Sequence, residues 1–144
     1  MILLDTNVVS ELMRQTPDLS VIAWIDIQPG YRLYISSVTR AEIELGIAIL
    51  PEGRRKQGLQ EAVVRMFGEF HGRCLAFDEL AASRYAALVS ARMRVGRPIS
   101  VEDAQIAAMA LASGFVLATR NISDFEGIDG LSMVNPWSGA PLIG

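Results

Sequence analysis

Four acidic residues, each in a separate segment, follow or precede apolar runs in a way that would bring them together in an α/β protein. Asp5 follows an apolar run at residues 1–4, and Asp124 comes five residues after Thr119, where another such run ends. Glu42 and Asp103 lie in the first turns of two helical patterns. Because open α/β sheets bind ligands at the carboxyl ends of their strands, we expect these four carboxylates to converge at one sheet edge. Clustered carboxylates are the hard oxygen ligands that Mg²⁺ or Mn²⁺ requires.

Each acid also has a purely structural explanation. Asp5 suits the N-cap of a helix that starts near Asn7, and Asp124 suits an ordinary loop. The spacings Thr39-x-x-Glu42 and Ser100-x-x-Asp103 fit capping boxes.

The helical neighbours of two of the acids favour a site over a cap. Residues three and four apart share a helix face, and both acids have mainly apolar neighbours at that spacing. The neighbours of Glu42 are Val38, Leu45, Gly46 and Ile49, and those of Asp103 are Ile99, Ile106, Ala107 and Ala110. A carboxylate partly buried along an apolar stripe is costly unless a bound cation compensates its charge.

The elements that would position these acids alternate between strands and helices. Strands are predicted at residues 1–4, 33–36, 73–77 and 115–119, with a weaker one at 131–134. Helical spacing covers residues 8–13, 19–27, 37–50, 79–95 and 100–114, and the polar stretch 51–72 becomes helical from about residue 59. This alternation predicts one α/β domain over residues 1–144, with a mainly parallel sheet of about five strands and helices on both faces. The tail at 135–144 is expected to be loose.

Composition excludes several classes of protein. With 144 residues, 51% of them hydrophobic, the chain has the size and apolar content of one globular domain rather than a disordered segment. A single cysteine, no basic leader and no apolar run near the ~20 residues of a membrane span predict a cytoplasmic protein that does not enter membranes. The net charge of -3 argues at first against a nucleic-acid partner.

Other catalytic chemistries lack the residues they need. His71 is the only histidine and Cys74 the only cysteine, so zinc sites, two-imidazole ribonuclease chemistry and a Ser-His-Asp triad are disfavoured. No Gly-rich phosphate loop follows any predicted strand. A receiver-like domain would use Asp5, Asp78 and Thr119, but the fifth strand lacks the lysine that such domains place against a phosphoryl group. A non-catalytic binding module, such as a receiver-like domain, is an alternative to an enzyme.

Four sequence segments, in order along the chain, carry a family resemblance. They are LLDTNVVSEL at the start, SSVTRAEIELGIAIL around Glu42, SVEDAQIAAMAL around Asp103 and LATRNISDFEGIDGLSMVNPW near the end. The chain resembles PIN-domain ribonucleases of the VapC/FitB type, the toxins of type II toxin-antitoxin pairs. The resemblance spans nearly the full length. The alternative to an enzyme is a non-catalytic binding module, PIN-like or receiver-like.

The resemblance implies an endoribonuclease that uses Mg²⁺ or Mn²⁺ to activate a water molecule. Asp5, Glu42 and Asp103 match the family's three acids, and the fourth position is either Asp124 or the uncharged Asn121, of which we favour Asp124. Thr6, Asn7, Thr119 and Asn121 are expected to support the metal ligands or the substrate, and Arg40, Arg92 and Arg120 are candidate contacts for backbone phosphates. The expected partners are RNA, a second copy of the chain and an antitoxin that is a small DNA-binding protein.

Overall fold

Five parallel strands form the centre of the protein. The computed structural model describes residues 1–138, and its strands are β1 (Ile2–Leu4), β2 (Leu33–Ser36), β3 (Cys74–Leu75), β4 (Val116–Ala118) and β5 (Met133–Val134). Their spatial order is β3-β2-β1-β4-β5, with Leu3 opposite both Tyr34 and Leu117. The sequence thus predicted the α/β class and the parallel sheet correctly. Strand β1 is central: β2 and β3 lie on one side of it, and the later strands β4 and β5 lie on the other. The carboxyl end of β1 is therefore the switch point at which such sheets bind ligands.

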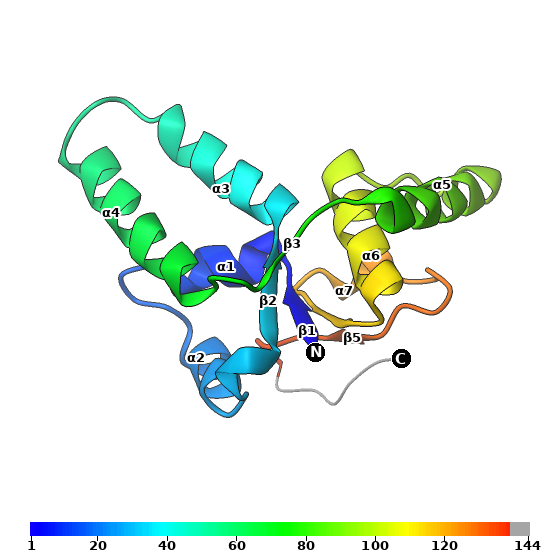
Figure 1. The fold of residues 1–144 in the computed structure, drawn as a ribbon, viewed down its shortest axis with the longest axis horizontal. Helices are drawn as coiled ribbons and strands as arrows, with labels where there is room; N and C mark the ends of the chain where they lie inside the picture. The colour runs from blue at the N-terminus through cyan, green and yellow to red at the C-terminus, as the bar shows by residue number, and fades with distance from the viewer. Residues whose placement is uncertain (139–144) are drawn as a thin grey trace.

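Within residues 1–138, seven α-helices and one short 3₁₀ helix connect the strands. They are α1 (Thr6–Leu12), α2 (Leu19–Asp26), η1 (Gly30–Arg32), α3 (Ser37–Ala48), α4 (Arg54–Glu69), α5 (Glu79–Arg94), α6 (Val101–Ser113) and α7 (Ile122–Phe125). In Figure 1, α1 to α4 gather on one side of the strands and α5 to α7 on the other.

Two apolar layers hold these helices to the sheet. On one face, Leu4 and Ile35 pack with side chains of α1 to α4, among them Val8 and Phe67. On the other face, Leu3 and Leu117 pack with α5, α6 and the segment after β4. Since neighbouring residues of a strand point to opposite faces, the run from Ile2 to Leu4 is apolar throughout and buried on both sides.

Polar caps set where the helices begin. Ser36 accepts a hydrogen bond from the Thr39 backbone N–H at 3.0 Å, and Ser100 accepts one from that of Asp103 at 3.1 Å. These caps fix α3 and α6 so that each starts at the carboxyl edge of the sheet. Gly114, with φ of +68°, ends α6 in the left-handed conformation that favours glycine.

Three local expectations differ from the structure. Helix α4 begins at Arg54 rather than near residue 59, because the side chain of Lys56 within its first turns donates to the Ala48 carbonyl and to Glu52 and so joins α4 to the end of α3. The segment after Thr119, expected as a loop, contains the short helix α7. Of the tail expected to be loose, residues 135–138 form a turn held by Asn135, and residues 139–144 lie outside the described residues.

Among residues 1–138, no helix has the length and apolar character needed to cross a membrane.

Candidate active site

Asp5 is the most constrained acid at the carboxyl edge of the sheet. Its side chain is 3% exposed and accepts hydrogen bonds from the Thr6 backbone N–H at 2.8 Å and the Thr119 hydroxyl at 2.8 Å. The Asn7 amide donates to the same carboxylate at 3.2 Å. Asp5 therefore does cap α1, but it also faces a cavity of about 520 Å³ that Glu42 and Asp103 line as well. Asp5 therefore fits both its explanation as a helix cap and the prediction that it belongs to a site.

Burial controls the protonation of Asp5. Removal from water raises the pKa of its carboxyl from 3.8 to about 6, against the hydrogen bonds from Thr119 and Thr6, which lower the pKa. The negative charges of Asp103 and Glu42 add to the upward shift. A positive ion in the cavity would reverse these effects, because it favours the ionised form.

Glu42 reaches the cavity from α3, but from a solvent-exposed position. Its Oε1 accepts a hydrogen bond from the Thr6 hydroxyl at 2.8 Å, and that hydroxyl also lies 2.9 Å from the Thr39 hydroxyl. The expectation that Glu42 is partly buried along an apolar stripe is wrong. The buried face of α3 is Thr39, Ile43 and Ile47, whereas Leu45 and Ile49 beside Glu42 are 63% and 74% exposed.

Asp103 lies on the first turn of α6, partly buried as predicted. Burial raises the pKa of its carboxyl, the Ser100 hydroxyl lowers it, and the charges of Asp124 and Glu102 raise it. Asp103 lines two neighbouring cavities. One also contains Asp5 and Glu42, and the other, of about 510 Å³, contains Asp124.

The two candidates for the fourth position point to different cavities. Asn121 lines the cavity that contains Asp5, and its backbone N–H donates to the Thr119 hydroxyl at 3.0 Å. Asp124 lies on α7 and lines only the neighbouring cavity, although its charge acts on Asp103. The structure therefore brings together Asp5, Glu42, Asp103, Thr6, Asn7 and Asn121, with Thr119 behind Asp5 and Asp124 to one side.

The donors at this edge suit a hard divalent cation in kind. They are carboxylates, hydroxyls and amide oxygens, with no imidazole or thiolate among them. In residues 1–138, however, no three acidic, histidine or cysteine side chains are gathered as closely as a metal site requires. Asp5, with its carboxylate fixed by three donors and its pKa raised by burial, is the residue that a cation would compensate most.

Comparisons with known proteins identify the family of the chain. The chain matches the family described as PIN domain over residues 2–131. It is 44% identical to VapC ribonuclease Y4jK of Sinorhizobium fredii, a match over 97% of this chain and 100% of the relative. It is 40% identical to toxin FitB of Neisseria gonorrhoeae, over 95% of this chain and 99% of FitB. The chain is a PIN-domain protein of the VapC/FitB type.

The fold of this PIN domain also has a close experimental counterpart. The structure of FitAB bound to an IR36 DNA fragment contains a chain that superposes with a TM-score of 0.88 at 40% identity, covering 95% of this chain and 96% of that one. The β3-β2-β1-β4-β5 sheet and its helices are thus those of a PIN domain.

We call the cavity lined by Asp5, Glu42 and Asp103 the acidic cavity. Only one of the three arginines predicted to contact backbone phosphates lines it. Arg120 does so and is exposed. Arg40 pairs with Glu44 at 3.3 Å and lies 4.8 Å from the centre of the Phe67 ring.

The expectation for Arg92 is wrong. Its side chain is buried, 5% exposed, and its Nη2 donates to the backbone carbonyls of Asp124 at 2.8 Å and Glu126 at 3.0 Å. The buried guanidinium thus holds the backbone at the end of α7 in place through these two hydrogen bonds. A second arginine nearby, Arg97, donates to the Ser123 carbonyl at 2.9 Å.

Four residues that line the acidic cavity were not predicted as site residues. They are Ser10, Glu11, Arg14 and Trp137. Glu11 is buried, accepts the Asp18 backbone N–H at 2.8 Å and pairs with Arg14 at 3.3 Å. The spacing of Asn7 and Glu11 places them on one face of α1, with Arg14 just after the helix, and this spacing was the signal available in the sequence.

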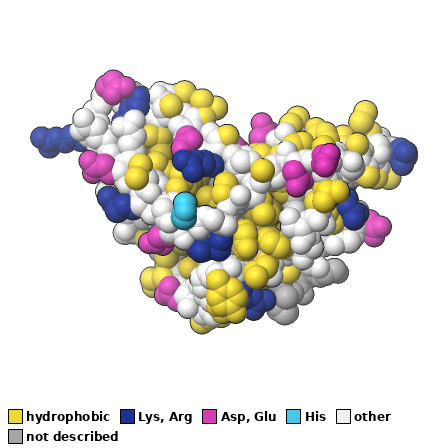
Figure 2. Space-filling model, in the orientation of Figure 1, with side chains coloured by type: hydrophobic (Ala, Val, Ile, Leu, Met, Phe, Trp, Pro, Cys, Tyr) yellow, Lys and Arg dark blue, Asp and Glu magenta, His cyan; other side chains and the backbone are white. Residues whose placement is uncertain are grey.

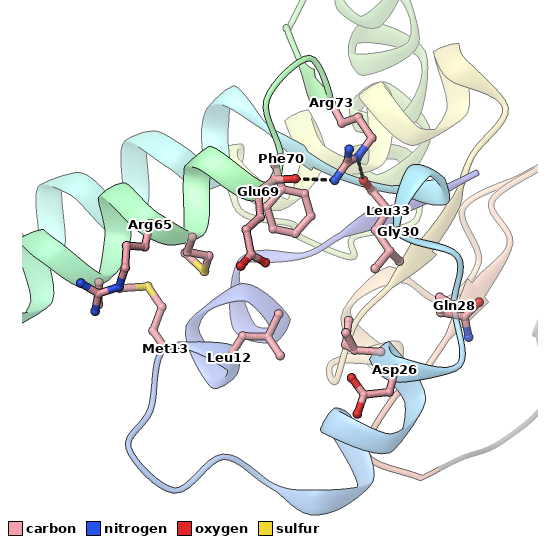
Figure 3. A pocket seen from close by; sticks show the side chains of 13 residues that line it. Leu12, Met13, Asp26, Gln28, Gly30, Leu33, Arg65, Glu69, Phe70 and Arg73 are labelled. Atoms are coloured by element: carbon pink, nitrogen blue, oxygen red, sulfur yellow. Dashed lines mark hydrogen bonds between the residues drawn. The ribbon is translucent and has the colours of Figure 1, made fainter.

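A second cavity of this PIN domain lies away from Asp5, Glu42 and Asp103. It measures about 710 Å³ and lies between α1, α2, β2 and α4 (Figure 3). Leu12, Met13 and Phe70 supply apolar walls, and Arg73 crosses its upper edge to donate to the carbonyls of Leu33 and Glu69. It contains none of the residues predicted to be catalytic, so we place the chemistry in the smaller acidic cavity.

Proposed function

We propose that this chain is the toxin of a type II toxin-antitoxin pair and an endoribonuclease that requires Mg²⁺ or Mn²⁺. The observation that carries the proposal is the Asp5 carboxylate, buried at the end of the central strand and facing a cavity that Glu42 and Asp103 also line. The names of its relatives, a VapC ribonuclease and toxin FitB, support the reaction class.

The metal ligands would be Asp5, Glu42 and Asp103, with Asp124 or Asn121 as the fourth group. A bound divalent cation supplies a more acidic water and neutralises charge on the scissile phosphate. The protein's own contribution is to hold these donors in place. Thr119 and Asn7 fix the orientation of the Asp5 carboxylate, and the Thr6 hydroxyl holds Glu42 toward the cavity.

Ionised Asp5 is the form that this function needs. Because burial raises the pKa of its carboxyl to about 6, the ionised form prevails at neutral pH but not in mild acid. At subsaturating Mg²⁺ or Mn²⁺, where protons compete with the cation for Asp5, cleavage should therefore fall as the pH decreases through about 6.

The proposed partners are an antitoxin and a second copy of the chain, both acting in the cytoplasm. One solved relative is a FitAB complex bound to DNA, which supports an antitoxin that binds DNA. Apolar side chains exposed on α3 and α5, such as Leu45, Ile49 and Met93, support a protein partner (Figure 2). Light scattering of the purified chain, with and without Leu45→Asp, tests self-association.

Matched substitutions test the nuclease. Asp103→Asn should abolish cleavage of a single-stranded RNA in Mn²⁺, while Glu102→Gln, its exposed neighbour, should cleave normally. In the same way, Glu42→Gln should abolish cleavage, whereas Glu44→Gln should cleave normally. If the Asp103→Asn protein cleaves at the wild-type rate, and without metal, the nuclease assignment is wrong. If Mn²⁺ neither raises the melting temperature nor supports cleavage, a binding module is the better description.

A further inference from the structure

Arg120 and Trp137 form a stacked pair at the rim of the acidic cavity. The guanidinium carbon of Arg120 lies 5.0 Å from the centre of the Trp137 ring. Both residues line the cavity that contains Asp5, Glu42 and Asp103. Arg120 follows β4 and Trp137 follows β5, so the pair stands at the same edge of the sheet as the acids.

The backbone on both sides of this pair is held in place. The Arg120 backbone N–H donates to Asn7 Oδ1 at 3.4 Å, and the amide of the same Asn7 donates to Asp5 at 3.2 Å. The Trp137 backbone N–H donates to Asn135 Oδ1 at 2.9 Å. Asn7 thus links the rim to the most buried acid of the site.

Arg120 differs from the two other arginines that stack on aromatic rings. Arg40, over Phe67, also pairs with Glu44, and Arg73, over Phe70, donates to two carbonyls. Within residues 1–138, Arg120 has no acidic partner within 4.0 Å. The Arg120 guanidinium therefore lies over an indole without a direct ion pair, beside a cavity that acidic residues line.

A single-stranded nucleic acid suits such a pair. Nucleobases stack on aromatic rings and on guanidinium planes, and this contact tolerates any base because every base has a π face. A polyanion entering an acidic cavity also gains from a positive group at the rim. From these contacts we propose that Arg120 and Trp137 form a stacking platform for one nucleobase of the RNA, next to the phosphate that is cut. This inference rests on the proposed function.

The test uses Trp137 as its own reporter. Trp24, the other tryptophan, packs against the core on α2, and Trp24→Phe leaves Trp137 as the single indole. Fluorescence of this variant is followed in EDTA while a short single-stranded RNA is added, and then the same oligonucleotide with abasic sites. Stacking predicts quenching by the intact RNA and little by the abasic one.

Substitutions in the wild-type background then separate stacking from charge. Loss of a stacked base costs about 1–3 kcal/mol, so Trp137→Leu should weaken RNA binding about 5- to 150-fold, and Trp137→Phe should restore most of it. Arg120→Lys, which keeps the charge but not the plane, should lose affinity for intact RNA and not for abasic RNA. Arg84→Gln, an exposed arginine on α5, is the control for net charge.

The possible failures are distinguishable. Equal binding of intact and abasic RNA, or no effect of Trp137→Leu in a protein that melts like the wild type, overturns the platform. An Arg120→Gln variant that weakens both RNAs equally, with Trp137→Leu silent, also overturns it and makes Arg120 a phosphate contact. If intact RNA quenches Trp137 fluorescence and the variants lose affinity for intact RNA only, but no metal-dependent cleavage is found, the platform is upheld and the nuclease is refuted.

Discussion

Replacing Asp5 by asparagine should make the metal-free protein more stable at neutral pH. The Asp5 carboxyl has a pKa of about 6 in the folded protein against 3.8 in the unfolded chain. Between these values the folded state holds a proton that the unfolded state has released, so the free energy of unfolding falls as the pH rises from about 4 to about 6. Above pH 6 the folded protein carries the full cost of a buried, ionised carboxylate.

The size of this effect follows from the pKa difference. A gap of about two units at about 1.4 kcal/mol each gives at most ~3 kcal/mol, or roughly 6–12 °C in melting temperature for a domain of this size. Asp5→Asn removes the titrating group and keeps a side chain that can still accept the Thr6 N–H bond. The gain is smaller than the maximum because the bond from Thr119 to a charged acceptor is lost.

Thermal melts in EDTA between pH 4 and pH 8 measure the effect. The quantity of interest is the melting temperature of Asp5→Asn minus that of the wild type, which should rise with pH up to about 6 and then level off. Glu44→Gln, an exposed acid on α3, should show no such trend. A difference that is flat across this range, or a variant less stable than the wild type at pH 7.5, would refute the account of Asp5 as an uncompensated buried charge.

Three further outcomes are expected. Mn²⁺ at about 100 times its dissociation constant should stabilise the protein by about 2.7 kcal/mol at pH 7.5. The stabilisation should be smaller at pH 5, because protons compete with the cation for Asp5. An equal shift of the melting temperature at both pH values would contradict this. Thr119→Val removes a hydrogen bond that favours the charged form, so it should raise the pKa of Asp5 further and move the acid limb of the pH–rate profile upward. Arg92→Met should cost about 1–3 kcal/mol and speed amide hydrogen exchange in residues 122–128, whereas Arg94→Met, exposed on the same helix, should do neither.

The sequence identified the acids whose position depends on chain order alone. Asp5 comes directly after an apolar run, and Asp103 lies in the first turn of a helix capped by Ser100, and both features place a residue at the carboxyl edge of the sheet. Burial was predicted correctly for Asp103 and incorrectly for Glu42. Two apolar stripes run along α3, and only packing against α4 and the sheet decides that Ile43 and Ile47 are the buried ones.

The features that escaped prediction depend on contacts between distant segments. Arg92 was predicted as a candidate contact for backbone phosphates, yet its acceptors are carbonyls 32 and 34 residues further along the chain. The pairing of Arg120 with Trp137 joins the ends of two strands, and no local pattern reveals it. Helix α7 has only four residues, which is too short for a periodic signal.

The central position of β1 also determines when during synthesis the site can form. Residues 2–4 pair with residues 33–34 and with residues 116–118, so the burial of Asp5 must wait until β4 has left the ribosome. A nascent chain interrupted between Asp103 and β4 contains Asp5, Glu42 and Asp103 but not the strand and hydroxyl that hold Asp5 in place. Translation that stops before β4 therefore yields a fragment without the assembled site, and the site forms only after the chain through Thr119 has been synthesised.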